Sequence, residues 1–86
     1  MMNLYSVFDK VSKVFQFPCA VENDDAAIRG FVGLADSYKF FPDLELYCVG
    51  SFDMETGLIT PIEVVPAFVC SGSQFSVAKD GDTDEV

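Results

Sequence analysis

The alternation of apolar and polar side chains predicts strand, strand, helix, strand, strand along the chain. Residues 3–9 alternate as a strand, with Tyr5 and Val7 on one face and their immediate neighbours on the other. A turn at 9–12 leads into a second strand at 13–21, where apolar residues again recur at every second position. The first third of the chain therefore predicts a pair of antiparallel strands.

Two more strands are predicted in the second half of the chain. Residues 44–52 have the clearest strand pattern, and a turn at 53–57, with Asp at its start and Gly at its end, leads into a return strand from 58 to about 65. Pro18 and Pro61 cannot donate a ladder hydrogen bond, so each should lie at a sheet edge or a break. Alternation within 44–52 places five side chains on a shared face: Leu44, Leu46, Cys48, Gly50 and Phe52.

A helix is predicted after Asn23, whose side chain can accept a hydrogen bond from a free backbone N–H of the first turn. Two acidic residues follow, which suits the positive end of the helix dipole. Apolar residues then recur at helical spacing, and the helix should end near Tyr38 or Lys39, before a proline. Gly30 and Gly33 indicate a close backbone approach, with the sheet as the expected neighbour. The apolar face consists of Ala27, Ile28, Phe31, Leu34, Ala35 and Tyr38.

This order of elements predicts an α+β fold, a small antiparallel sheet of about four strands with one helix packed on one face. One domain is expected, residues 1–70, with a short last strand at 67–70 and Ile28, Phe31 and Leu34 buried against the sheet. Residues 71–86 are rich in Ser, Gly and Asp, and the last seven carry four acids and no base. We therefore expect a flexible acidic tail.

The charge of the chain argues against contact with nucleic acid. The 86 residues carry 14 acidic and 5 basic side chains, a net charge of −9, whereas proteins hold phosphates mainly through Lys and Arg. The acidity suits solubility or a basic protein partner. Arg29, the one arginine, either pairs with Asp25 or Glu22 or anchors an anionic partner. No apolar run approaches the ~18 residues of a membrane helix, so we expect no membrane contact.

The residue types that carry most catalysis and metal binding are missing. The sequence has no His, no CxxC pair and no phosphate-binding glycine loop, which excludes His-based catalysis and His-containing zinc sites. Cys19, Cys48 and Cys70 are far apart, and the first two lie in apolar runs, where free cysteines are usually buried. The sequence predicts no catalytic residue, no metal, no cofactor and no enzyme activity.

Aromatic residues offer a candidate contact surface. Tyr5 and Tyr47 are placed so that they could share the outer side of the sheet, either as a stabilising cross-strand pair or as a stacking platform. Lys10 and Lys13, the closest pair of basic residues, would add the positive charge that single-stranded DNA binding requires. Together with Arg29, these residues are the candidates for partner binding.

Several segments, in a fixed order and spacing, resemble the small non-structural protein of gokushoviruses, the tailless single-stranded DNA phages of the Microviridae. The similarity spans residues 4–59, roughly two-thirds of the chain. The segments are LYSVFD at 4–9, Phe17-Pro18, NDDAAIRGF at 23–31, and LYCVGSFD at 46–53 followed by Thr56-Gly57.

The resemblance implies a protein made in the cytoplasm of an infected bacterium and absent from the mature capsid. It further implies a non-enzymatic accessory role in viral DNA replication or packaging, or in host takeover, through contacts with a viral or host protein. A homodimer is a further option. Two alternatives remain open, a single-stranded DNA-binding protein and a scaffold or minor structural protein.

Overall fold

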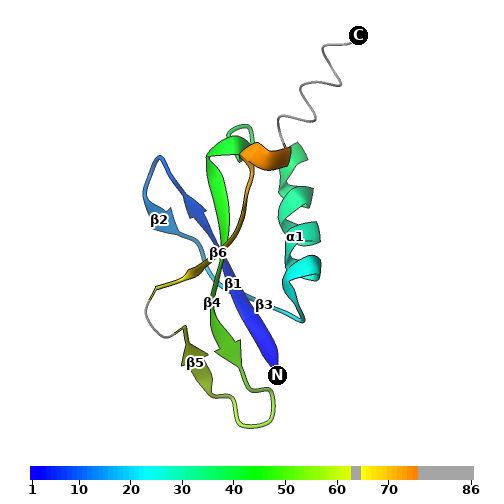
Figure 1. The fold of residues 1–86 in the computed structure, drawn as a ribbon, viewed down its shortest axis with the longest axis vertical. Helices are drawn as coiled ribbons and strands as arrows, with labels where there is room; N and C mark the ends of the chain where they lie inside the picture. The colour runs from blue at the N-terminus through cyan, green and yellow to red at the C-terminus, as the bar shows by residue number, and fades with distance from the viewer. Residues whose placement is uncertain (63–64, 76–86) are drawn as a thin grey trace.

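Two long antiparallel strands, β1 (Met2–Asp9) and β4 (Leu44–Phe52), form the centre of the fold. The computed structural model describes residues 1–62 and 65–75 of the chain. The main helix lies along one face of the sheet that these strands build (Figure 1). The α+β fold predicted from the sequence is confirmed.

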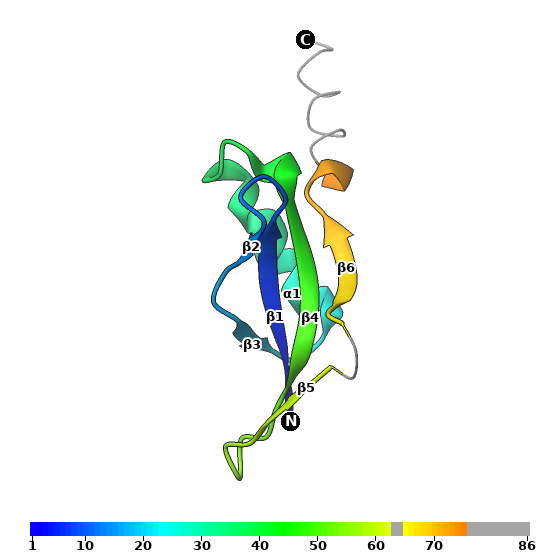
Figure 2. The same cartoon turned by 90° about the vertical axis from the view of Figure 1, so that its left-hand side faces the viewer.

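Each central strand pairs on its outer side with two short strands instead of one long strand (Figure 2). The predicted strand at 13–21 is divided at Gln16–Pro18, as expected for a proline that cannot donate to the ladder. The predicted return strand is shorter than expected and ends at Pro61, while residues 63–64 lie outside the described part of the chain. The short strands are β2 (Val14–Phe15) and β3 (Cys19–Val21) beside β1, and β5 (Ile59–Pro61) and β6 (Ala67–Ser71) beside β4.

The helix begins as predicted and ends earlier. The Asn23 side chain accepts a hydrogen bond from the Ala26 N–H at 2.9 Å, and α1 (Asp24–Val32) follows. A tighter 3₁₀ helix, η1 (Gly33–Asp36), continues it, so the prediction of one α-helix to Tyr38 or Lys39 is wrong. Gly33 favours the change because glycine contributes little to helix stability, and a 3₁₀ turn satisfies carbonyls at a helix end. A second 3₁₀ helix, η2 (Phe41–Asp43), precedes β4.

The core lies between α1 and one face of the sheet. Phe31 from α1 is 3% exposed and packs against Phe41 with ring centroids 4.9 Å apart. Ile28 and Leu34 are partly buried against the same core, as predicted. The buried cluster consists of Tyr5, Ala27, Phe31, Phe41, Leu44, Leu46 and Cys70.

A bulge changes which residues of β4 share a face. Tyr5 pairs with Cys48 while Leu4 pairs with Gly50, so one extra residue of β4 lies between the two pairs. Gly50 and Phe52 therefore pair with β1 residues on the face away from α1, and the prediction that they share a face with Leu44, Leu46 and Cys48 is wrong. Gly50 is required because a Cβ there would lie 2.5 Å from the Thr60 carbonyl oxygen.

The cysteines differ in burial. Cys70 is buried and Cys48 is partly buried against the core, whereas Cys19 is exposed because β3 is a short edge strand. The expected burial of Cys19 is wrong. All three thiols are free.

The described chain continues beyond the last strand. The Gly72 N–H donates to the Leu44 carbonyl at 2.8 Å, and Phe75 packs against the core. Most of the predicted flexible tail, residues 76–86, lies outside the described residues. Within the described ranges, no helix is long and apolar enough to cross a membrane.

Candidate functional site

Four aromatic rings gather on the face of the sheet opposite α1, and we call this surface the outer aromatic face. Tyr47 of β4 is its centre, with ring centroids 6.1 Å from Phe8, 5.5 Å from Phe15 and 5.6 Å from Phe68. The Phe8 and Phe15 centroids are 4.7 Å apart. Three of these contacts are edge-on, the arrangement that aromatic pairs favour. The outer aromatic face consists of Phe8, Phe15, Tyr47 and Phe68.

This face arises from strand alternation and remains open to solvent. Tyr47 lies between Leu46 and Cys48, both of which face the core, so its own side chain must point the other way. Phe15 is 42% exposed and Phe68 is 55% exposed. Figure 2 looks onto this side of the sheet, with α1 behind it, and within the described ranges no helix covers it.

One polar contact fixes the central ring of the outer aromatic face. The Tyr47 hydroxyl donates to Glu45 Oε1 at 2.9 Å. Partial burial, with the hydrogen bond to Glu45 and its negative charge, raises the pKa of Tyr47 above its ordinary value. The Tyr47 hydroxyl therefore stays protonated, and the Glu45 carboxylate lies beside it at the polar end of the ring.

Tyr5 lies on the opposite face, so the prediction that it shares the outer side of the sheet with Tyr47 is wrong. It is 3% exposed beneath α1, and its hydroxyl donates to Asp24 Oδ1 and accepts from Asn3 Nδ2. Burial, followed by the hydrogen bond to Asp24, raises the pKa of Tyr5 to about 12. In the register, Tyr47 stands opposite Ser6, one position beyond Tyr5.

The basic candidates are divided between the two sides of the sheet. Lys10 and Lys13 lie exposed in the β1–β2 turn, and Phe8 and Phe15 pair across the two strands that this turn joins. Lys13 has a φ of 61°, a backbone conformation uncommon for a residue with a side chain. Arg29 is exposed in the last turn of α1, on the other side of the sheet.

Arg29 does not form the predicted ion pair. Across residues 1–62 and 65–75, the structure records no salt bridge from Arg29 to Asp25 or Glu22. The structure thus brings Tyr47 close to the turn that carries the two lysines, and it separates Tyr5 and Arg29 from them.

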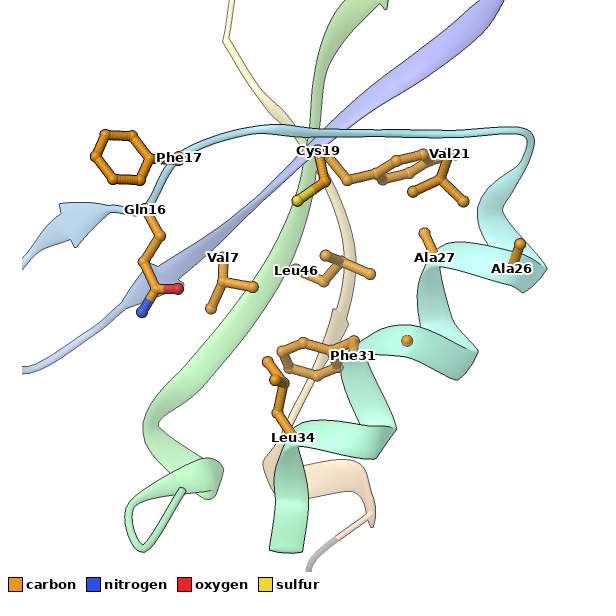
Figure 3. A pocket seen from close by; sticks show the side chains of 12 residues that line it. Val7, Gln16, Phe17, Cys19, Val21, Ala26, Ala27, Phe31, Leu34 and Leu46 are labelled. Carbon is orange, nitrogen blue, oxygen red and sulfur yellow. The ribbon is translucent and has the colours of Figure 1, made fainter. Parts of the chain in front are cut away.

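A cavity of about 300 Å³ lies between α1 and the edge segment 16–21 (Figure 3). Its floor is the core-facing side of β1 and β4, and its walls come from the helix and from the edge segment. Carbon atoms dominate the lining, as in most sites that bind apolar groups. The lining includes Tyr5, Phe17, Cys19, Ala27, Gly30 and Leu34.

The missing side chain of Gly30 helps to form this cavity. A Cβ added at Gly30 or at Gly33 would have no atom within 4 Å, so the predicted close approach to the sheet is wrong. Gly30 lines the cavity, and Ala26 and Ala27 provide its small side chains on the same helix face. Sequence reasoning did not find this cavity; the signal that could have found it is the run of small residues on the buried helix face.

The arrangement suits binding through contact surfaces. Among the described residues, no three His, Cys, Asp or Glu side chains come close enough together to hold a metal ion. The outer aromatic face and the cavity beneath α1 are the features with the geometry for apolar contacts.

Comparison with family models gives a match over residues 2–75 to a family described as "Phage ORF5 protein". The match includes both central strands, α1, the outer aromatic face and the cavity. Comparison with curated proteins and with solved structures gives no match.

Proposed function

This chain belongs to the Phage ORF5 protein family, and from that premise we propose that it is a non-enzymatic phage accessory protein that works by binding another protein. Its partner is a viral or host protein that acts in viral DNA replication or packaging, or in host takeover. Its place of action is the cytoplasm of the infected bacterium. The binding surface is the outer aromatic face.

The observation that carries this proposal is the exposure of a contiguous aromatic surface on the sheet. Single exposed apolar residues are common, but contiguous patches on small proteins often mark interaction sites. Phe15 and Phe68 stand half-exposed on either side of Tyr47, in a row that crosses the sheet. Aromatic residues, tyrosine above all, are enriched in protein interfaces because each buries a large area at small entropic cost.

The charge of the molecule supports a basic protein partner. The chain has a net charge of −9, and Glu45 sits beside the central tyrosine of the outer aromatic face. A positive rim on the partner would therefore accelerate association and select against acidic competitors. The expected partner has an apolar pocket or groove surrounded by Lys and Arg.

The test is an affinity capture from infected cells with the tagged full-length chain, with half of each sample treated with nuclease. Phe15→Ser and Phe68→Ser should each reduce capture of the specific partner, because both remove exposed rings from the proposed surface. Phe40→Ser is the matched control, since Phe40 is 65% exposed and lies outside that face. The proposal would be contradicted if a partner were captured in the presence of nuclease and neither Phe15→Ser nor Phe68→Ser reduced that capture.

A second candidate function, single-stranded DNA binding, is favoured by one observation. Lys10 and Lys13 occupy the turn that joins the strands of Phe8 and Phe15, so positive charge and stacking rings lie together. Proteins that bind single strands combine these two elements. The net charge opposes this function, which is why it ranks second.

This candidate predicts salt-sensitive binding of a labelled single-stranded oligonucleotide. A Lys10→Ala, Lys13→Ala double variant and Phe15→Ser should each weaken binding. Lys39→Ala serves as the control, because Lys39 lies over the Phe40 ring and away from the outer aromatic face. Affinity that is indifferent to the double variant would exclude this function.

A further inference from the structure

We propose that two copies of this chain form a symmetric dimer in which the Phe17 ring of each copy enters the cavity beneath α1 of the other. The two copies meet along the edge segment 14–21, which contains β2 and β3. This inference uses the face of the sheet that α1 covers and does not rest on the function proposed above.

Phe17 is presented to solvent in a way that is unusual for a phenylalanine. It is 93% exposed, the highest value among the large hydrophobic residues described in the structure. Pro18 follows it and restricts the backbone of Phe17 to extended conformations, which reduces the backbone freedom that binding would remove. Figure 3 shows this ring turned away from the cavity whose rim it occupies.

The cavity next to Phe17 has the size and chemistry to receive such a ring. Its volume is about 300 Å³, at the small end of the range for ligand pockets, and an apolar side chain suits it better than a cofactor. Phe31 and Leu34 from the helix and Leu46 from the sheet provide apolar walls. The missing side chain at Gly30 keeps the helix side of the cavity open.

The placement of ring and cavity selects the second copy as the occupant. In a two-fold dimer the same patch is used by both partners, so each copy must offer both the inserted group and its receptor. Phe17 and the cavity lie side by side on one edge, and one contact between two copies can therefore satisfy both at once. The pair is closed after two copies, which prevents growth into a filament.

The edge is also suited to contact between two acidic molecules. Residues 14–21 contain no charged side chain, although the chain as a whole carries −9. Val14 is 57% exposed on the same edge, which adds apolar surface beside the inserted ring. Contact along this segment therefore places no charged side chain of residues 14–21 against the partner copy.

The test is sedimentation equilibrium of the full chain over a wide concentration range. Two variants are compared with the parent, one that changes the inserted group and one that changes the cavity that receives it. Phe17→Ser removes the inserted ring. Gly30→Leu fills the receiving cavity, and because a Cβ at Gly30 meets no atom within 4 Å, this variant should fold at least as stably as the parent. Each change should raise the dimer dissociation constant by about 100-fold or more, as expected for the loss of an interface anchor.

Matched controls keep the test specific. Phe40→Ser removes another exposed phenylalanine, and Gly33→Leu adds the same side chain at a helical glycine outside the cavity. Both should leave the dissociation constant unchanged. Thermal unfolding of every variant checks that a lost dimer does not reflect a lost fold.

Contacts between isotopically distinct copies, measured by nuclear magnetic resonance, provide the direct readout. Intermolecular contacts from Phe17 to Ala27 or Leu34 would support the proposal. A chain that stays monomeric up to millimolar concentration would overturn it. A dimer that survives Phe17→Ser or Gly30→Leu, or contacts from Phe17 to the cavity of its own chain, would do the same.

Discussion

The two faces of the sheet are both aromatic, but among residues 1–62 and 65–75 a helix covers only one of them. On the covered face, Tyr5 and Phe31 are each 3% exposed. On the outer aromatic face, Phe15 and Phe68 retain about half of their accessible surface, and both rings pack edge-on against Tyr47. The same strands supply both faces, because successive side chains point in opposite directions.

The difference shows how a small chain divides its apolar residues between stability and contact. A domain of this size buries only about 60% of its unfolded surface, so it cannot cover both faces of its sheet. The covered face should hold most of the free energy of folding. The outer aromatic face is free to bind because folding does not depend on it to the same degree.

The comparison is tested most strongly by truncating one ring on each face. Phe31→Ala should lower the free energy of unfolding by about 3–5 kcal/mol, because it empties a site in the buried core. Phe15→Ala should cost about 1 kcal/mol, since that ring is 42% exposed. Urea denaturation followed by circular dichroism measures both. Equal costs would mean that the two faces contribute equally to stability.

The two tyrosines predict a difference in alkaline stability. Because the pKa of Tyr5 is raised from 10.0 to about 12 in the folded state, the folded chain keeps a proton that the unfolded chain loses. The stabilisation is complete below pH 10 and declines by about 1.4 kcal/mol per pH unit up to pH 12. Tyr5→Phe should flatten this decline, and Tyr47→Phe should flatten it less.

Denaturant midpoints measured from neutral pH to pH 12 test this difference, and the phenolate absorbance of each variant identifies the tyrosine that titrates. A decline that is equally steep in Tyr5→Phe and in the parent would show that the covered tyrosine is not its source.

A smaller effect is expected for the interaction between rings within the outer aromatic face. The Tyr47 and Phe68 rings lie 5.6 Å apart in an edge-on arrangement. A double-mutant cycle with Tyr47→Ala and Phe68→Ala should give a coupling energy of about 0.5–1.5 kcal/mol. A coupling near zero would indicate that the rings share a surface without stabilising one another, and that their exposure serves binding alone.

The smallest expected effect is a gain in stability on the covered face. Gly30→Ala should stabilise the chain by about 0.5–1 kcal/mol, because alanine favours helix and the new methyl group meets no atom. Gly72→Ala is the informative contrast. A Cβ at Gly72 would lie 2.0 Å from the Phe41 carbonyl oxygen, so this variant should be destabilised. Thermal unfolding of both variants measures the two effects.

Local patterns predicted the start of the helix and the positions of the main strands. The alternation in residues 3–9 correctly places Tyr5 and Val7 on one face, and Asn23 caps the helix as expected. Pro18 divides the second predicted strand, and Pro61 ends a short edge strand. These features depend on the covalent properties of single residues and their neighbours, which the sequence states directly.

Features that depend on register and packing were not predictable from the sequence. The bulge between the Leu4–Gly50 and Tyr5–Cys48 pairs shifts the two strands by one residue, and alternation within β4 alone gives no sign of it. The same limit applies to Gly30. From the sequence, a glycine in a helix indicates close packing, whereas in the structure the missing side chain leaves space for a cavity. Tyr5 and Tyr47 were assigned to one surface because their relative register was unknown.

The pairing of β1 with β4 determines when this chain can complete its fold during synthesis. Met2 pairs with Phe52 and Asp9 with Leu44, so β1 leaves the ribosome well before the strand with which it pairs. Until then β1 has only the short local strands β2 and β3 beside it. At roughly 5–20 residues per second, synthesis takes longer than the folding of most small mixed domains. The pace of translation, more than the search for contacts, should therefore set the arrival of the native protein in the infected cell.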